Sequence, residues 1–255
     1  MNRIAKAFEN KAFIPFITGG DPNVATTEKL LYALYEGGAD IIEIGIPFSD
    51  PVAEGSVIEA ASARALLAGC TADLLFDMVA RVRADIPVAI VFMTYYNPVY
   101  VYGAERFIKR CVEVGVDGII VPDLPFAERD ELYLPCKAHG LELISLIAPN
   151  STDEIVAEIA RGSSGFLYCV SSMGTTGVRE SLDDSTRRII EIAKVASDTP
   201  CAVGFGISTA EQAEEVVQFA DGVIVGSAIV QIIAEKGEKC IDDVREFARS
   251  MKERW

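Results

Sequence analysis

The strongest constraint in this sequence is an alternation that repeats eight times along the chain. Short runs rich in β-branched and aromatic residues alternate with stretches that carry apolar residues at three- and four-residue spacing. This alternation predicts parallel strands joined by crossover helices. The β-rich runs are 12–20, 39–47, 87–93, 118–123, 141–148, 165–171, 200–206 and 222–228. Eight such units in 255 residues favour an α/β fold closed into a (β/α)8 TIM barrel over an eight-stranded doubly wound sheet, which the pattern alone leaves open.

The N-terminal residues add one helix to the predicted barrel. Residues 2–10 predict an extra N-terminal helix in front of the first strand, where it could close the bottom of the barrel. We find no linker, low-complexity run or strong internal repeat. The sequence therefore predicts a single TIM-barrel domain over residues 1–255.

Composition narrows the class of partner and the location. The formal net charge of −15 disfavours a nucleic-acid partner, because a polyphosphate attracts a basic surface. The first ten residues lack the apolar core of a signal peptide, and no apolar run approaches the roughly 20 residues of a membrane helix. Six scattered cysteines without a C-x-x-C pair, and the single histidine His139, give no metal-binding pattern. We expect a soluble cytoplasmic protein that binds no metal.

The second β-rich run places one carboxylate inside the predicted barrel. Side chains alternate along a strand, so Ile42, Ile44 and Ile46 share one face, and Glu43 lies on the other with Ile41. The isoleucine face suits the surrounding helices, which turns Glu43 inward. Burial should raise the pKa of Glu43 towards the range useful for proton transfer. The alternative is a structural glutamate held by a buried partner.

The loop after this run carries two more acidic residues. PFSDPVAEG is polar and punctuated by proline and glycine, which is typical of a functional loop. Asp50 and Glu54 lie in it, and one of them could reach over a substrate to give a second acid–base group. Acidic loops are also common for solubility alone, so the loop by itself leaves both interpretations open.

Glycine and hydroxyl residues follow the last three β-rich runs. The segments are SSMGTTGVRE, GFGIST and VGSAIV. Free backbone N–H groups after the seventh and eighth strands form the usual phosphate site of such barrels. GFGIST is not a dinucleotide fingerprint, because Thr209 stands where the third glycine belongs, and no P-loop motif is present. The sequence predicts a phosphate-bearing ligand, although these glycines could also only make turns.

These blocks together resemble the α subunit family of tryptophan synthase. ITGGDP, IEIGIPFSDPVAEG, VPDLP, YCVSSMGTTG, GFGIS and GSAIV occur in the family's order and spacing, and the likeness extends from residue 12 to about residue 250. The resemblance implies retro-aldol cleavage of indole-3-glycerol phosphate to indole and glyceraldehyde 3-phosphate, without metal or organic cofactor. This is a carbon–carbon lyase reaction of tryptophan biosynthesis.

The resemblance also implies roles for individual residues. Glu43 matches the family's general acid, and Glu54 matches a second catalytic carboxylate that is aspartate in most members. MTYYNP departs in length from some members, so whether Tyr95 or Tyr96 faces the pocket stays open. The substrate-binding residues implied are Phe16 and Tyr168 along the indole, Thr176 of a closing loop, and Gly177, Phe205, Gly206, Gly226 and Ser227 around the phosphate.

A partner follows from the same resemblance. The family assembles as an α2β2 complex with a β subunit that holds pyridoxal phosphate and receives indole, and Asp50 matches a residue at that interface. Three alternatives stay open: a weakly active regulatory subunit that binds the phosphate ligand, a free-standing indole-releasing lyase, and another phosphate-binding barrel enzyme. The E-I-G-I-P-F-S-D-P block argues against the last of these.

Overall fold

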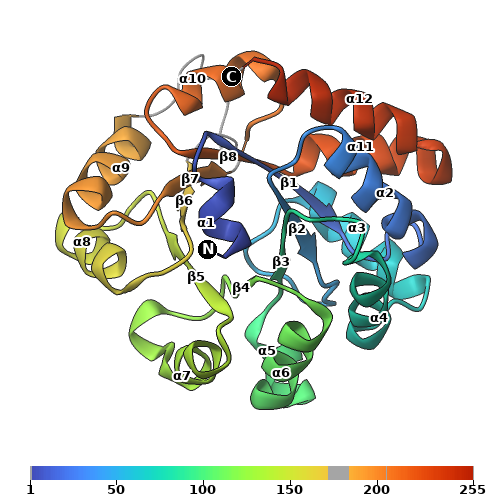
Figure 1. Cartoon of the computed structure of the whole chain (residues 1–255), viewed down its shortest axis with the longest axis horizontal. Coiled ribbons are helices and arrows are strands. Elements are labelled where there is room, and N and C mark those ends of the chain that lie inside the picture. Colours follow the sequence, from blue (N-terminus) through green and yellow to red (C-terminus); the bar gives the residue numbers. More distant parts are fainter. Residues whose placement is uncertain (1, 172–183, 205, 255) are drawn as a thin grey trace.

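The eight β-rich runs form one closed barrel of parallel strands in the computed structural model, which describes residues 2–171, 184–204 and 206–254 (Figure 1). The first strand pairs with both the second and the last, with Phe16 opposite Glu43 and Phe13 opposite Val223. This closure confirms the barrel and excludes the open sheet. The strands are β1 (Ala12–Thr18), β2 (Ile41–Gly45), β3 (Ala89–Met93), β4 (Gly118–Ile120), β5 (Glu142–Ile147), β6 (Leu167–Val170), β7 (Cys201–Gly204) and β8 (Gly222–Val225).

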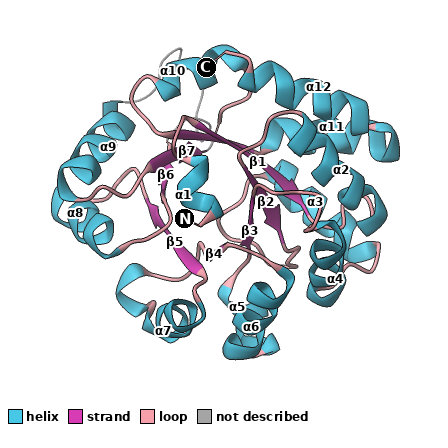
Figure 2. Cartoon of the chain, viewed as in Figure 1, coloured by secondary structure: helices cyan, strands magenta, loops and turns pink. Residues whose placement is uncertain are grey.

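Helices form a ring outside the strands (Figure 2). Their bounds are α2 (Val24–Glu36), α3 (Ser56–Leu67), α4 (Ala72–Val82), α5 (Tyr96–Tyr102), α6 (Ala104–Val114), α7 (Asp130–His139), α8 (Asp153–Gly162), α9 (Asp184–Ala196), α10 (Ala210–Val217), α11 (Ser227–Lys236) and α12 (Ile241–Lys252), with 3-10 turns η1 (Phe126–Glu128) and η2 (Gly237–Lys239). Side-chain caps explain where several begin: Asn23, Thr71, Thr152 and Thr209 each accept a hydrogen bond from a backbone N–H in the first turn.

The strands are shorter than the β-rich runs that predicted them. The second run, 39–47, yields β2 over Ile41–Gly45, and the fourth, 118–123, yields only Gly118–Ile120. Pro47 and Pro122 lie near the ends of these runs, and proline cannot donate to a strand ladder, so these ends join the loops instead. The polar ends of the runs are therefore free to build the mouth of the barrel.

The predicted N-terminal helix is present as α1 (Arg3–Ala7) and closes one end of the barrel. Figure 1 shows it across the barrel centre. Ile4 is fully buried in the cluster of side chains inside the barrel, and the Phe8 ring centroid lies 5.5 Å from that of Phe166. Ile4 and Phe8 also border Gly118 and Gly222, the first residues of β4 and β8. This end is therefore the one where the strands begin.

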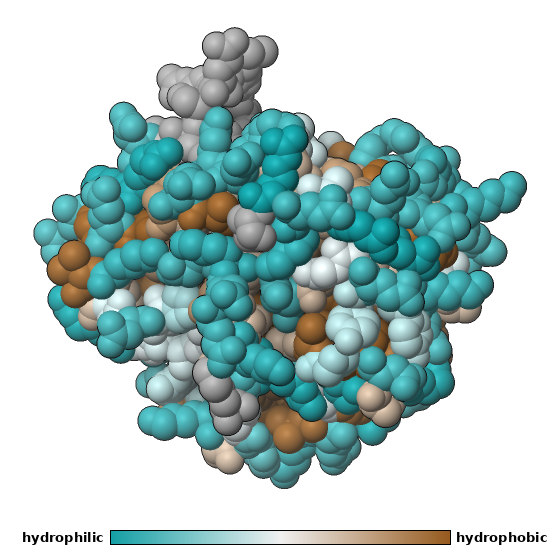
Figure 3. All heavy atoms as spheres, turned by 45° about the horizontal axis from the view of Figure 1, so that its top comes forward, coloured by the Kyte–Doolittle hydropathy of each residue, from teal (hydrophilic) through white to brown (hydrophobic). Residues whose placement is uncertain are grey.

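Two apolar layers hold the fold together. Inward side chains of alternate positions, among them Ile14, Val91 and Ile144, fill the barrel, while a larger cluster packs between strands and helices. Polar and charged side chains cover much of the face shown in Figure 3, with apolar groups between them. Among the described residues, no helix has the length and apolar character needed to cross a membrane.

Candidate active site

The carboxyl ends of the strands surround a cavity of about 570 Å³, here called the main cavity. Its walls come from distant parts of the chain, because the ends of parallel strands meet at one edge of the barrel. Seven of the residues singled out from the sequence line it: Phe16, Glu43, Glu54, Tyr168, Gly206, Gly226 and Ser227. The remaining wall includes apolar side chains such as Met93, Val170 and Ile224. The cavity thus combines two carboxyls with flat apolar surfaces and a glycine-rich end.

Glu43 lies on the inner face of β2, as its alternation with the isoleucines predicts. Ile42 and Ile44 pack in the outer cluster, while Glu43 is 1% exposed. Neither carboxyl oxygen has a hydrogen-bond partner among the described residues. Burial above all, and then the charge of Glu54, raise the pKa of Glu43 to about 8. No buried partner of the kind that a structural glutamate needs is found in the part of the chain described.

Glu54 extends over the same cavity from the loop between β2 and α3. It is half-buried, and its Oε2 atom is buried without a hydrogen-bond partner in the described structure. Burial, followed by the charge of Glu59, raises the pKa of Glu54 to about 7. The two carboxyls therefore titrate on either side of a narrow pH interval, which suits one to donate a proton while the other accepts one.

A tyrosine fixes the loop that carries Glu54. The Tyr95 hydroxyl accepts hydrogen bonds from the backbone N–H groups of Val52 at 3.1 Å and Ala53 at 3.0 Å. Tyr95 is 2% exposed, and its ring centroid lies 5.3 Å from that of Phe48. A phenolic oxygen can accept two hydrogen bonds, so one side chain holds two successive peptides. These two hydrogen bonds position the backbone immediately before Glu54.

The sequence left open whether Tyr95 or Tyr96 faces the pocket. Neither residue lines the main cavity. Tyr96 packs partly buried against the outer cluster, and its backbone N–H donates to Asp123. The role of Tyr95 was not predicted, because it depends on a contact between two loops that no local pattern encodes.

Aromatic side chains and glycines shape the apolar part of the cavity together. Phe16 and Tyr168 are 4% and 5% exposed. A Cβ atom on Gly45 would lie 2.7 Å from Phe16 Cζ, and a Cβ atom on Gly204 would overlap the Tyr168 hydroxyl. A larger residue at either glycine would therefore displace one of the two rings. Burial and the nearby charge of Glu43 hold the pKa of Tyr168 well above its usual value, so its hydroxyl stays protonated.

The glycine-rich end of the cavity is built from the ends of β7 and β8. Gly206 has a φ of 77°, in the region that favours glycine. Gly226 precedes α11, and Ser227 is its first residue. The unpaired N–H groups and positive dipole of this helix start favour an anion. Thr176, Gly177 and Phe205, the other residues implied in ligand binding, lie outside the described residues.

Asp50 is not part of the main cavity. It is exposed in the loop after β2 and accepts a hydrogen bond from the Ser49 hydroxyl at 2.5 Å. Its position leaves its carboxylate free for solvent or for another protein. Within the described structure, no group of three or more His, Cys, Asp and Glu side chains is arranged to hold a metal ion.

Proteins of similar sequence carry one family name. Residues 3–255 match the family described as tryptophan synthase alpha chain. The tryptophan synthase alpha chain of Lacticaseibacillus casei is 44% identical over 253 residues, which cover 99% of this chain and 95% of that protein. The alpha chain of Methanocaldococcus jannaschii is 46% identical over 94% of this chain and 86% of its own length.

Solved structures give the same result for the fold. The structure of a tryptophan synthase a2b2 complex from Pyrococcus furiosus contains a chain that is 38% identical, with a TM-score of 0.90 over 95% of this chain and 98% of that one. The tryptophan synthase subunit alpha of Legionella pneumophila is 37% identical, with a TM-score of 0.89 over 99% of this chain and 98% of that one.

Proposed function

The chain belongs to the tryptophan synthase alpha chain family, whose members are lyases that cleave indole-3-glycerol phosphate to indole and glyceraldehyde 3-phosphate, and we propose that this reaction takes place in its main cavity between Glu43 and Glu54. The observation that carries the proposal is the inward-facing Glu43 carboxyl, buried at the wall of the main cavity without a hydrogen-bond partner in the described part of the chain. A group in that setting is costly for the fold unless a ligand or a reaction uses it.

The first step moves two protons. Glu43 is protonated at neutral pH, because its pKa is about 8, and it donates that proton to C3 of the indole ring. The Glu54 carboxylate removes the proton from the indole nitrogen. The ring becomes a neutral indolenine, whose C=N bond can accept the electron pair of the bond to be broken.

The second step breaks the carbon–carbon bond. The Glu43 carboxylate takes the proton of the glycerol hydroxyl next to the ring, and the aldehyde forms as the bond to C3 breaks. The electron pair returns to the ring, and Glu54 gives its proton back to the nitrogen. Both carboxyls regain their starting protonation states, so the cycle needs no cofactor and no redox partner.

The rest of the main cavity supports binding and orientation. The helix start at Gly226 and Ser227, with Gly206 beside it in the cavity, offers donors for the phosphate, and Phe16 and Tyr168 offer flat surfaces for the indole ring. By their correspondence to the family motif, Thr176, Gly177 and Phe205 complete this set.

The partnership follows from the family. The relative from Pyrococcus furiosus is described as part of an a2b2 complex, and this chain assembles in the same way with a β subunit that holds pyridoxal phosphate and receives indole. Asp50, exposed beside the mouth, is proposed to contact that subunit. We further propose that the chain acts in the cytoplasm as a single barrel domain over 1–255.

Cleavage assays on three proteins test this function. Wild type should cleave indole-3-glycerol phosphate, and Glu43→Gln should lose about a thousandfold in rate while still binding the ligand, because the amide cannot donate the proton. Glu54→Asp keeps the charge and should stay within about tenfold of wild type. Each is measured alone and with a β subunit. No cleavage by wild type in either case would overturn the proposal and favour a purely regulatory, ligand-binding subunit.

A further inference from the structure

A second cavity opens beside the main one, between β4 and β5. Its volume is about 320 Å³, and it shares Ala53, Met93, Tyr168 and Val170 with the wall of the main cavity. We call it the side cavity. The ladder between the two strands ends at Ile120 and Ile144, so the chain beyond these residues is not held together by strand pairing. The side cavity extends from the barrel mouth to the layer of η1 and α8, where Phe126 and Ile159 line it.

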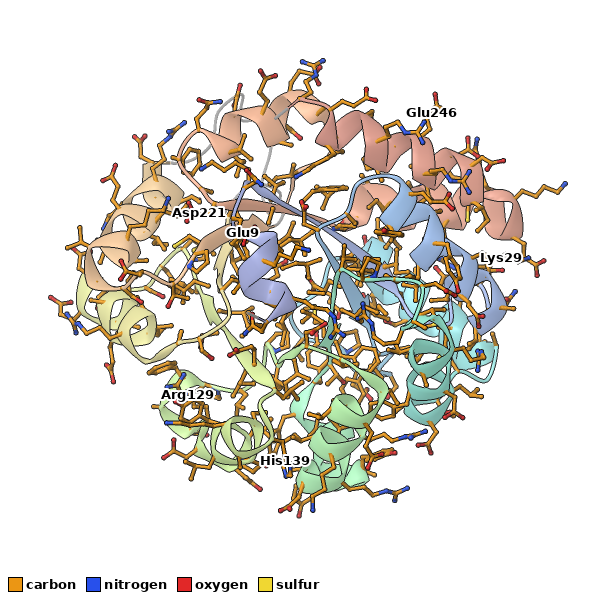
Figure 4. All side chains as sticks on the ribbon, in the orientation of Figure 1. Glu9, Lys29, Arg129, His139, Asp221 and Glu246 are labelled. Atoms are coloured by element: carbon orange, nitrogen blue, oxygen red, sulfur yellow. The ribbon has the colours of Figure 1, made fainter. Side chains whose placement is uncertain are left out.

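One cationic side chain lies in this otherwise mainly apolar cavity. The Arg129 guanidinium stacks 3.7 Å from the Phe126 ring centroid and 4.4 Å from that of Tyr133. It donates a hydrogen bond of 2.6 Å to the carbonyl of Gly162 at the end of α8. Figure 4 shows Arg129 at the edge of α7 that faces α8. These contacts hold the guanidinium in a fixed position.

Within the described residues the Arg129 guanidinium forms no salt bridge, although the charge of Asp130 acts on it. Among the described residues, no carboxylate lies within 4.0 Å of its guanidinium. Its other polar neighbour is the Ser145 hydroxyl, 3.5 Å from Nη1. A guanidinium has five N–H donors, so several stay available to an arriving acceptor. Arg129 is half-buried, and this partial burial lowers its pKa more than the charges of Tyr133 and Asp130 raise it.

The order of the strands around the barrel places the side cavity opposite the proposed phosphate site. The strands follow one another from β1 to β8 around the closed barrel, so β4 lies across from β8. The anion site at Gly226 and Ser227 lies at the end of β8. A ligand bound there by its phosphate, and long enough to cross the barrel mouth, would extend its far end towards the gap between β4 and β5. In the proposed reaction this far end is the benzene ring of the indole.

We propose that the side cavity is a subsite for a carboxylate on the benzene ring of the indole, recognised by Arg129. The inference rests on the proposed function, because the phosphate end sets the direction of the ring. It extends the substrate class from the parent indole to indoles that carry an acidic group. A carboxylate would pair with the two-pronged guanidinium and take the place of water beside it.

The test runs the reaction towards carbon–carbon bond formation. Glyceraldehyde 3-phosphate is combined with indole, with indole-5- and indole-6-carboxylate, and with the corresponding carboxamides. The carboxamides match the shape of the carboxylates without the charge. For one of the two ring positions, the KM of the carboxylate should be about tenfold lower than that of its carboxamide, as a charged hydrogen bond provides. Arg129→Gln should remove this difference, and indole itself should react as in wild type.

A second variant distinguishes the effect of the side-cavity volume from that of the Arg129 charge. Ile159→Phe fills the side cavity and keeps Arg129, so it should exclude both substituted indoles and leave indole unaffected. Equal KM values for carboxylate and carboxamide in wild type, or a preference that survives Arg129→Gln, would overturn the proposal. If wild type does not convert indole at all, the proposed function fails instead. Calorimetry with the indole carboxylates then tests the subsite directly, and binding that does not depend on Arg129 would refute it.

Discussion

Replacing Glu43 by glutamine should make the protein more stable while it removes the activity. The Glu43 carboxyl is 1% exposed and unpartnered within the described structure, and its pKa of about 8 is far above its ordinary value of 4.5. In the unfolded chain the carboxyl is ionised at neutral pH, so folding must take up a proton. Glutamine has nearly the same shape and needs no proton.

The size of the effect follows from linkage. Between pH 4.5 and about 8 the folded state binds one proton at this site and the unfolded state binds none. The stability provided by Glu43 is therefore fully present below the unfolded pKa and falls by about 1.4 kcal/mol per pH unit as pH rises to the folded pKa. Relative to wild type, Glu43→Gln should gain about 3 kcal/mol in free energy of unfolding at pH 7 and little near pH 4.5.

Urea denaturation at several pH values between 5 and 9 measures this difference. The control is Glu246→Gln, which alters a glutamate that is exposed on α12 (Figure 4) and should give the same difference from wild type at every pH. A gap between Glu43→Gln and wild type that does not widen with pH would refute the argument. So would a glutamine variant that is less stable than wild type at pH 8.

Three further predictions concern the same cavity. The kcat/KM of cleavage should be bell-shaped in pH: it falls below about 7, where Glu54 gains a proton, and above about 8, where Glu43 loses one. Tyr95→Phe removes the acceptor of two partly buried peptide N–H groups and frees the Glu54 loop, so kcat should fall about tenfold with a smaller change in KM, as steady-state kinetics would record. Gly204→Ala places a methyl group against the Tyr168 hydroxyl and should lower the free energy of unfolding by about 1–3 kcal/mol in urea titrations.

The two variants have matched controls, and each of the three predictions has a contrary outcome. Gly55→Ala adds a methyl group with no atom within 4 Å at the N-cap of α3 and should cost clearly less stability than Gly204→Ala; an equal loss in the two variants would argue against the clash. Tyr96→Phe tests a hydroxyl that does not touch the loop, and a kcat as low as that of Tyr95→Phe would remove the special role of Tyr95. A pH profile that is flat between 6 and 9 would exclude the two carboxyls as the groups that control the rate.

The sequence predicted the architecture and the inward carboxyl because both depend on local periodicity. Alternation of period two placed Glu43 inside the barrel, and glycine-rich ends of successive strands brought Gly206 and Gly226 to one cavity. The contact of Tyr95 with the Glu54 loop and the gap beside Arg129 were not predictable in this way. The first is a contact between loops far apart in sequence, and the second arises because β4 stops after three residues.

The way in which Tyr95 holds the loop has a consequence for how this protein can vary. Its hydroxyl accepts hydrogen bonds from the peptide N–H groups of Val52 and Ala53, which do not depend on the identity of either side chain. Val52 is 79% exposed, so its side chain is free to change without moving the loop. Position 52 should therefore accept almost any residue in a randomised library, with proline excluded because it has no N–H to donate. Sequence drift and protein engineering can both alter the rim of the active site here while the two hydrogen bonds to Tyr95 are kept.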